Sequence, residues 1–345
     1  MKLKNNFWRH GLWLILLAAC GGATGGTETG NATPDGVAYA IADSIDTVTG
    51  LLNAEPDFNS AFLDFAPSSR SRRGWSIFPS AHAGPLCVET AECNEAEHRA
   101  ALIKNFSGGC DDGDGFEVEG RRYISWFDMG DGACGGPTSK PVFLNAIQGM
   151  GARQIRSTDA IPPEGACGVP QTALVYAFDD GARLEITQCG RLDYLDFQSS
   201  APGEGRVTES LDLALGRRVL FRPDGSRVYD HSLLTPSPMQ IDVVKETGQN
   251  RPNKTIHSGT LRVVHNLAQF SVDTEYQEVS WDYNECRCYP VRGTMTFRVR
   301  NLVTGQEQGI GSLTFDRETT GACRVALAEF QGKSLNIRLH ACRGF

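Results

Sequence analysis

Alternation of apolar and polar residues in the C-terminal third of the chain is the feature that most constrains the fold. Apolar residues stand at every second position in the segments 293–300 and 334–341. A period of two places the apolar side chains on one face of a strand and the polar side chains on the other. One buried, apolar face and one solvated, polar face are typical of an antiparallel sheet that packs on one side. We therefore expect a mainly β fold, an antiparallel sandwich or a strongly curved sheet, with short N-terminal helices.

Other segments carry the same alternation or a short apolar run between turn residues. The candidate strands among them are 121–127, 142–148, 172–178, 182–188, 192–198, 217–221, 226–230, 239–245, 259–265, 268–275, 278–284, 310–316 and 323–329. Four turns between strands contain Gly, which favours tight hairpins, and in two of them Asp precedes it. These turns are Asp179-Asp180-Gly181, Pro223-Asp224-Gly225-Ser226, Thr304-Gly305 and Gln331-Gly332-Lys333.

Helical spacing is confined to the first third of the chain. The segment 37–52 has apolar residues three and four positions apart, with Asp43 and Asp46 off that stripe, so it predicts an amphipathic helix. Its polar face is acidic, which favours packing on protein over lying on a membrane surface. We expect a second short helix around Phe58 and Phe62, and a third at 94–105, capped by Asn94.

The N-terminus has the composition of an export signal. Lys2, Lys4 and Arg9 precede the apolar run 12–19, which is far shorter than the roughly 20 residues that span a bilayer as a helix. The run closes on Leu17-Ala18-Ala19-Cys20, which resembles the lipobox of bacterial lipoproteins. The alternative is an ordinary secretory signal with a chance cysteine at its end.

The resemblance to lipoproteins implies a lipid anchor. It implies diacylglyceryl on the Cys20 thiol, cleavage before Cys20, and acylation of the new amine, for example with palmitate. Two or three acyl chains, each contributing about 0.8 kcal/mol per buried CH₂, anchor a protein stably. Gly21, in place of Asp, resembles lipoproteins that are directed to the outer membrane.

The remaining chain divides by composition. We expect a signal peptide at 1–19, a flexible tether at 20–34, a helical segment at 35–66 and a disordered basic linker at 67–85. The linker holds three arginines beside aromatic residues, a composition that also suits contact with anionic lipid headgroups. A disulfide-stapled, mainly β body follows at 86–345, with a division into two subdomains near residue 200 as an alternative.

Charge excludes one class of partner. Loss of residues 1–19 removes three of the 33 basic residues, so about 30 remain against 41 acidic residues. Phosphate contacts need clustered cations, and we therefore expect no nucleic-acid binding. No later segment is long and apolar enough to span a membrane, so the lipid is the one anchor we expect.

The cysteines agree with export. If Cys20 carries lipid, an even set of ten remains: Cys87, Cys93, Cys110, Cys134, Cys167, Cys189, Cys286, Cys288, Cys323 and Cys342. Disulfides persist in oxidising compartments outside the cytoplasm. Sequence alone leaves the pairing open; local pairs would be Cys87–Cys93, Cys110–Cys134 and Cys167–Cys189, with the last four cysteines pairing among themselves. The spacings of a zinc site are absent from the sequence.

The acidic turn 110–115 is the best metal candidate. Asp111, Asp112 and Asp114 stand on a Gly-rich turn, where carboxylates can converge on Ca²⁺. The twelve-residue loop of an EF-hand, with its closing Glu, is absent. Asp and Gly are also ordinary turn formers, and we favour that second interpretation.

The sequence offers no catalytic motif. It lacks the nucleophile elbow, the His-Glu-x-x-His zinc motif, the P-loop and the dinucleotide fingerprint, and its scattered histidines suit surface or packing roles. We expect a lipid-anchored cell-envelope protein with a non-enzymatic binding or structural role. Two alternatives stay open: a periplasmic hydrolase acting on envelope polymer or carbohydrate, and a subunit of an envelope assembly that docks through the helix 37–52.

Overall fold

A computed structural model describes most of the C-terminal half of the chain and parts of the N-terminal half. The described residues are 30–53, 88–94, 99–105, 110–111, 117–127, 152–157, 173–178, 180–201, 204–246, 249, 252–282, 285–286 and 289–339. The expected signal peptide, the basic linker, the second helix around Phe58 and the candidate strand 142–148 lie outside these residues.

The described part contains two helices and a series of strands. The helices are α1 (Pro34–Asn53) and the single turn α3 (Arg317–Thr320). The first strands are short: β1 (Val88–Asn94), β2 (Arg99–Asn105), β3 (Cys110–Asp111), β4 (Glu117–Glu119), β5 (Arg121–Phe127), β6 (Ala152–Ser157) and β7 (Leu174–Ala177). The later strands are β8 (Arg183–Ala201), β9 (Glu204–Phe221), β10 (Arg227–Lys245), β11 (Asn253–His265), β12 (Phe270–Trp281), β13 (Arg292–Asn301), β14 (Glu307–Asp316), β15 (Val325–Phe330) and β16 (Lys333–Ser334).

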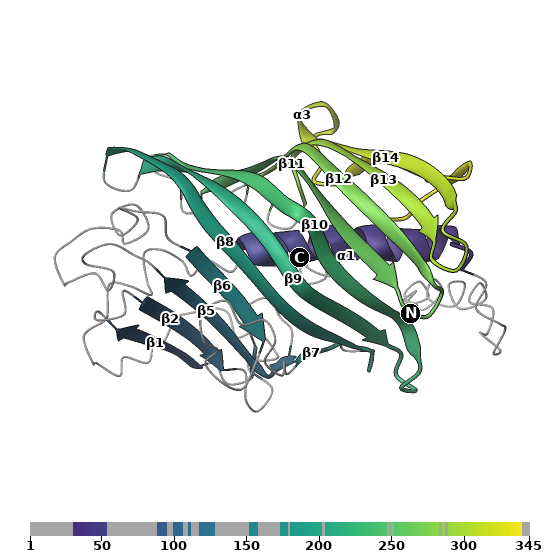
Figure 1. The fold of residues 1–345 in the computed structure, drawn as a ribbon, viewed down its shortest axis with the longest axis horizontal. Coiled ribbons are helices and arrows are strands. Elements are labelled where there is room, and N and C mark those ends of the chain that lie inside the picture. The colour runs from purple at the N-terminus through teal and green to yellow at the C-terminus, as the bar shows by residue number, and fades with distance from the viewer. Residues whose placement is uncertain are drawn as a thin grey trace, which may run out of the picture.

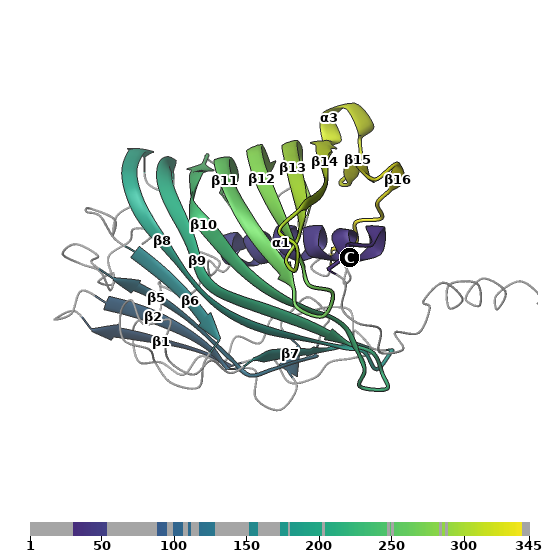
Figure 2. The same cartoon turned by 45° about the vertical axis from the view of Figure 1, so that its right-hand side comes forward.

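The strands form one antiparallel sheet that curves around α1. Its hydrogen-bonded order is β1-β2-β5-β6-β8-β9-β10-β11-β12-β13-β14-β15-β16, and β7 joins the first residues of β8 while β4 and then β3 extend from β7. Figures 1 and 2 show α1 lying across the concave side of strands β9 to β14. The expectation of a mainly β fold with a strongly curved sheet is confirmed, and a helix, in place of the second sheet of a sandwich, covers the concave face.

The sheet is continuous across residue 200. β8 and β9 pair from Arg183 with Phe221 to Ala201 with Glu204. The division considered near residue 200 therefore falls between two hydrogen-bonded neighbours, and we describe the body as one sheet.

The central strands are longer than their sequence patterns indicate. β8 and β10 each have 19 residues, whereas the alternation predicted two shorter strands in place of each. The pairing of β10 with β9 shifts register between Leu233 and Met239, around Pro236 and Pro238. A bulge shifts the phase of the alternation and lets a strand bend while it stays in the sheet. A pattern search with period two therefore divides one bulged strand into two.

Helix α1 forms where its sequence predicts. Thr33 caps it, because the Thr33 side chain accepts a hydrogen bond from the Gly36 N–H at 3.2 Å, and Pro34 occupies the first turn, where its missing N–H costs nothing. Gly36 packs on the ring of Phe270, where a Cβ atom would lie 3.1 Å from the ring. Almost every residue from 36 to 49 is buried, including the polar ones.

The core lies between α1 and the concave face of the sheet. It joins apolar helix residues to alternate residues of β9 to β15 and to the segment that follows β16. The core residues include Val37, Ile41, Ile45, Val48, Leu211, Leu233, Ile241, Val263, Tyr276, Trp281, Phe297, Phe315, Phe330, Ile337 and Leu339. The predicted strand 334–341 is confirmed only at β16, because residues 335–339 lie outside the regular sheet and contribute Ile337 and Leu339 to this core.

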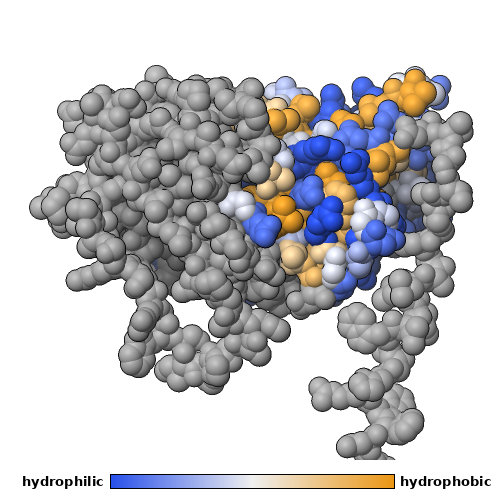
Figure 3. All heavy atoms as spheres, turned by 90° about the horizontal axis from the view of Figure 1, so that it is seen from below, coloured by the Kyte–Doolittle hydropathy of each residue, from blue (hydrophilic) through white to orange (hydrophobic). Residues whose placement is uncertain are grey.

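The convex face of the sheet is mainly polar, with a few exposed apolar residues such as Ile310 and Leu327. Cross-strand ion pairs run over it, such as Arg262–Asp273 and Arg298–Glu307, each at 2.6 Å. From below, the described part of the surface mixes hydrophobic and hydrophilic residues without one large hydrophobic area (Figure 3). The sheet thus has the solvated and the buried face that the alternation predicted.

One helix expectation is wrong. The described part of the segment 94–105 is extended, because β1 ends at Asn94 and β2 covers 99–105, pairing with β1 on one side and with β5 on the other. Residues 95–98 lie outside the described residues. Alanine and glutamate favour helices locally, but that preference is weak and two neighbouring strands override it. The four predicted hairpin turns are confirmed, and Gly181, Gly225, Gly305 and Gly332 in them all have positive φ.

Candidate functional site

Two polar groups of residues stand out in the described part of the chain. The first is buried between α1 and the sheet, and we call it the internal polar cluster: Asp43, Asp46, Arg218, Tyr229 and His231. The second lines a cavity at one end of strands β11, β12 and β13, and we call it the Trp281 cavity.

The internal polar cluster is centred on Asp43 of α1. Its carboxylate lies 2.6 Å from Nδ1 of His231 and 3.0 Å from Nε of Arg218, and it accepts a hydrogen bond from the Tyr229 hydroxyl at 3.1 Å. Arg218 also lies 3.7 Å from Asp46, one turn along the helix. Asp43 and His231 have no exposed surface and Arg218 has almost none.

Electrostatics keep Arg218 charged despite its burial. Burial alone would lower the pKa of Arg218, but the carboxylates of Asp43 and Asp46 raise it above its ordinary value. Burial, followed by the charge of Asp43, raises the pKa of Tyr229 well above its ordinary value, so the phenol stays neutral. A buried charge without a partner costs several kcal/mol, which is why the acidic helix face needs the cation that β9 supplies.

Aromatic rings close the cluster on one side. The rings of Tyr229 and His231 stack with centroids 4.3 Å apart, and His265 meets His231 edge-on at 4.8 Å. Burial and the neighbouring His231 lower the pKa of His265 to about 4, so this imidazole is neutral near pH 7. Because these groups are buried, the cluster is suited to fixing the position of α1 and not to admitting a substrate.

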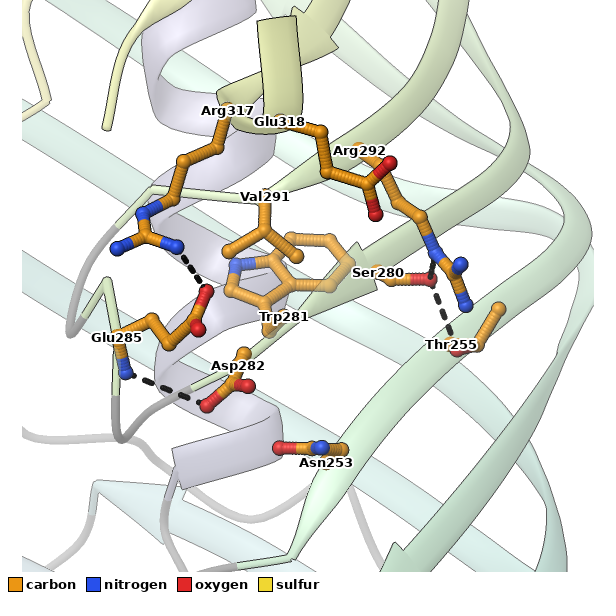
Figure 4. A pocket seen from close by; sticks show the side chains of 10 residues that line it. All are labelled: Asn253, Thr255, Ser280, Trp281, Asp282, Glu285, Val291, Arg292, Arg317 and Glu318. Carbon is orange, nitrogen blue, oxygen red and sulfur yellow. Dashed lines mark hydrogen bonds and ion pairs between the residues drawn. The ribbon is translucent and has the colours of Figure 1, made fainter. Parts of the chain in front are cut away.

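The Trp281 cavity has a volume of about 260 Å³. Two strand ends, the connection after β12, the start of β13 and α3 surround it (Figure 4). Its lining residues are Asn253, Thr255, Ser280, Trp281, Asp282, Glu285, Val291, Arg292, Arg317 and Glu318.

Hydrogen bonds hold the polar lining of the cavity in place. Arg317 forms an ion pair with Glu285, whose backbone N–H donates to Asp282 at 3.2 Å. On the other side of Trp281, Nε of Arg292 donates to the Ser280 hydroxyl at 3.3 Å (Figure 4). No ion pair of Arg292 is found among the described residues, so its guanidinium is available to a ligand.

Three further features belong to the walls of the cavity. The Oδ1 atom of Asn253 is buried and has no hydrogen-bond partner within the described part of the chain. Trp281 is fully buried and its Nε1 donates to Thr49 of α1 at 3.1 Å. The disulfide Cys286–Cys323 joins the connection after β12 to the segment after α3.

Most residues that the sequence singled out lie outside the described part. Cys20, Asp112 and Asp114 are among these, while Asp111 lies in β3, which pairs with β4. The carboxylates proposed for Ca²⁺ therefore have no described geometry. Within the described ranges no group of three or more His, Cys, Asp or Glu residues is arranged to hold a metal ion.

The cysteine expectations are met in part. Cys286 pairs with Cys323, as the expected pairing among the last four cysteines allows, and Cys189 is also disulfide-bonded. Cys93 lies in β1 and Cys110 in β3. The remaining five cysteines, Cys87, Cys134, Cys167, Cys288 and Cys342, lie outside the described residues.

Sequence analysis missed the internal polar cluster. It placed Asp43 and Asp46 on an outer face of the helix, and the structure corrects this, because the sheet curls around both sides of α1. One signal was present in the sequence: residues 34–53 contain no Lys or Arg, and most of their polar positions hold small side chains. A helix with no long polar side chain is suited to burial on all sides.

Comparisons with known proteins add no relative to this picture. Searches against protein-family models, curated proteins and solved structures gave no match for this chain.

Proposed function

We propose that this chain is a lipid-anchored cell-envelope protein, directed to the outer membrane, with a non-enzymatic binding or structural role. The anchor rests on the Leu17-Ala18-Ala19-Cys20 motif and the short apolar run before it. The disulfide Cys286–Cys323 and the bonded Cys189 support an oxidising compartment. No helix in the described part of the chain has the length and apolar composition of a membrane span.

The filled interior of the sheet is the observation that favours a binding or structural role. Helix α1 occupies the concave face, and the charged groups beneath it are closed off from solvent. Enzymes usually work in a concave pocket that holds the reacting groups. In the described part of this molecule, a helix occupies the concave face.

The same burial argues against the docking alternative. The apolar face of residues 37–52 was considered as a docking element for an envelope assembly. Val37, Ile41, Ile45 and Val48 have no exposed surface, because the sheet of the same chain covers them. A partner could reach this face only by displacing the sheet.

Mass spectrometry of the purified membrane form tests the anchor. We expect the N-terminal peptide to begin at Cys20 and to carry the mass of two or three acyl chains. A Cys20→Ala variant should carry none of this mass. The proposal fails if the wild-type peptide carries no lipid, or if the chain begins elsewhere.

The Trp281 cavity supplies the binding part of the proposal. Its volume of about 260 Å³ lies below the roughly 300–1,000 Å³ of pockets for drug-sized ligands, so it suits a small molecule or a single group of a polymer. Its arginines are donors, and its carboxylates are acceptors. Hydroxyl groups donate and accept at one atom, so a sugar unit of an envelope polymer matches this lining.

Calorimetry with N-acetylglucosamine as the probe tests sugar binding. We expect the Arg292→Ala variant to bind at least several-fold more weakly than the wild type. Arg300→Ala is the matched control, because Arg300 lies on the same strand outside the cavity. Absence of binding to the wild type, or equal loss in both variants, would remove this candidate ligand.

One observation favours the hydrolase alternative: three carboxylates line the cavity. Two of these carboxylates already have partners in the protein, because Glu285 is paired with Arg317 and Asp282 accepts a backbone hydrogen bond. Glycoside hydrolysis ordinarily uses two free carboxyl groups on either side of the bond. Release of soluble sugar from envelope polymer, abolished by Glu318→Gln, would favour the hydrolase over the binding role.

A further inference from the structure

We infer that the turn between β13 and β14, residues 301–306, contacts the lipid surface and orients the body on the membrane. This inference rests on the proposed lipid anchor at Cys20. Four observations carry it: the attachment of the N-terminal segment to this turn, the length of chain before that attachment, the exposed apolar tip of the turn, and the hydrogen bonds made by its N–H groups.

The N-terminal segment enters the body at this turn. The side chain of Gln308 accepts a hydrogen bond from the Ala32 N–H at 2.8 Å and donates to the Gly30 carbonyl at 2.9 Å. Gly30 has a φ of +68° and packs so closely on Asn301 that a Cβ atom would collide with it. Residues 30–33, expected to be part of the tether, are therefore bound to the base of the turn.

Chain length limits how far this turn can lie from the membrane. Cys20 and Gly30 are ten residues apart, and a fully extended chain spans at most about 3.5 Å per residue. Gly30 therefore lies within about 35 Å of a lipidated Cys20, whatever conformation the intervening residues adopt. The opposite end of β14 lies about 30 Å from the turn, at 3.2–3.4 Å per residue of strand, so it can lie up to about 65 Å from Cys20.

The tip of the turn is apolar. Leu302 and Val303 are adjacent and are 43% and 63% exposed. Arg300, exposed on β13 just before them, has no ion-pair partner among the described residues. Two exposed aliphatic side chains next to a cation suit the boundary between acyl chains and anionic headgroups.

The backbone N–H groups of the turn have partners within the protein. The Asn301 side chain accepts from the N–H groups of Val303 and Thr304 at 2.8 and 2.9 Å. The N–H groups of the neighbouring residues also have partners: Leu302 donates to the Gln269 carbonyl, Gly305 to the Asn301 carbonyl and Gln306 to the Thr304 hydroxyl. A loop with unsatisfied N–H groups would lose free energy on leaving water, and this turn has none from residue 302 to 306.

Photo-crosslinking in vesicles tests the inference. The full lipidated chain is reconstituted in vesicles of phosphatidylethanolamine with a minor share of phosphatidylglycerol. A benzophenone amino acid replaces Val303 in one sample and Glu318 in another, as the control at the far end of β14. Both side chains are exposed, and retention of the Cys286–Cys323 disulfide checks that each variant folds.

We expect several-fold more lipid adducts at position 303 than at position 318. Equal yields at the two positions, or adducts at position 303 with a second copy of the chain and not with lipid, overturn the inference. The mass of the Cys20 peptide is measured in the same samples. Lipid on Cys20 with equal adducts overturns only the orientation, whereas absence of lipid on Cys20 overturns the proposed anchor and the inference with it.

Discussion

The Nδ1 atom of His231 lies 2.6 Å from the Oδ2 atom of Asp43, in a contact between β10 and α1 that is fully buried. Arg218 reaches the same carboxylate from β9 at 3.0 Å. Through these contacts two neighbouring strands hold one helix residue. Apolar packing alone would tolerate small rotations of the helix, whereas the short hydrogen bond between His231 and Asp43 is directional and restricts them.

Removal of the Asp43 carboxylate should strongly destabilise the fold. Asp43→Ala leaves the buried Arg218 guanidinium with the more distant Asp46 as its one carboxylate partner among the described residues, and loss of one partner from a buried ion pair typically costs about 3–5 kcal/mol. Urea denaturation measures this loss as a change in the free energy of unfolding. Asp35→Ala is the control, because Asp35 is exposed in the first turn of the same helix, where it contributes at most about 1 kcal/mol. Equal losses in the two variants would contradict the role given to Asp43.

Stability should fall in mild acid because of His265. Burial and His231 lower its folded pKa to about 4, below the ordinary value of about 6.5. Between these two values the unfolded chain binds the proton and the folded chain does not, so the free energy of unfolding decreases as the pH falls. The stability that the neutral imidazole of His265 contributes is fully present above about pH 6.5 and is lost by about pH 4. This contribution to the free energy of unfolding amounts to about 3 kcal/mol.

The variant His265→Gln isolates this contribution. The carboxylates of the protein also lose stability in acid, so the informative quantity is the difference between wild type and variant. We expect the free energy of unfolding of the variant to depend less steeply on pH between about 4 and 6.5. Parallel curves for the two proteins would show that His265 does not titrate in this window.

The sequence was sufficient for features that depend on near neighbours. The spacing of Val37, Ile41 and Ile45 predicted α1, and Gly225 and Gly305 predicted hairpin turns where the structure has them. Predictions failed where distant residues decide the outcome. Residues 99–105 form a strand because β5 pairs with β2, and helix propensity takes no account of such distant partners.

The internal polar cluster lay beyond sequence analysis for the same reason. Its helix and strand residues are far apart in the chain: Arg218 donates to Thr47 across 171 positions. An acid on a helix is usually solvated, and only the path of the sheet reveals that Asp43 is enclosed. The Trp281 cavity likewise combines residues from three strands and from α3, which no local pattern joins.

Gly311 should not tolerate a side chain. It stands opposite Phe297 in the pairing of β13 with β14, and a Cβ atom there would lie 2.2 Å from the Phe297 ring and 2.4 Å from the Glu329 carbonyl oxygen. Because Phe297 is buried in the core, it cannot move away freely, and Gly311→Ala should cost about 1–3 kcal/mol of stability. Thermal denaturation measures the loss. Ser312→Ala, at the next and exposed position, is the control and should change stability by less than about 0.5 kcal/mol.

Loss of the disulfide Cys286–Cys323 should destabilise the fold and open the Trp281 cavity first. The two cysteines are 37 positions apart, and closing a loop of that length stabilises a protein by about 4 kcal/mol in the chain-entropy estimate. We expect the double variant Cys286→Ser, Cys323→Ser to lose about 2–4 kcal/mol in denaturant unfolding. Hydrogen exchange should accelerate most in residues 285–291 and 317–323, where the disulfide holds Glu285 close to Arg317. Exchange that rises equally in β11 and β12 would show that the disulfide stabilises the whole sheet and not the cavity.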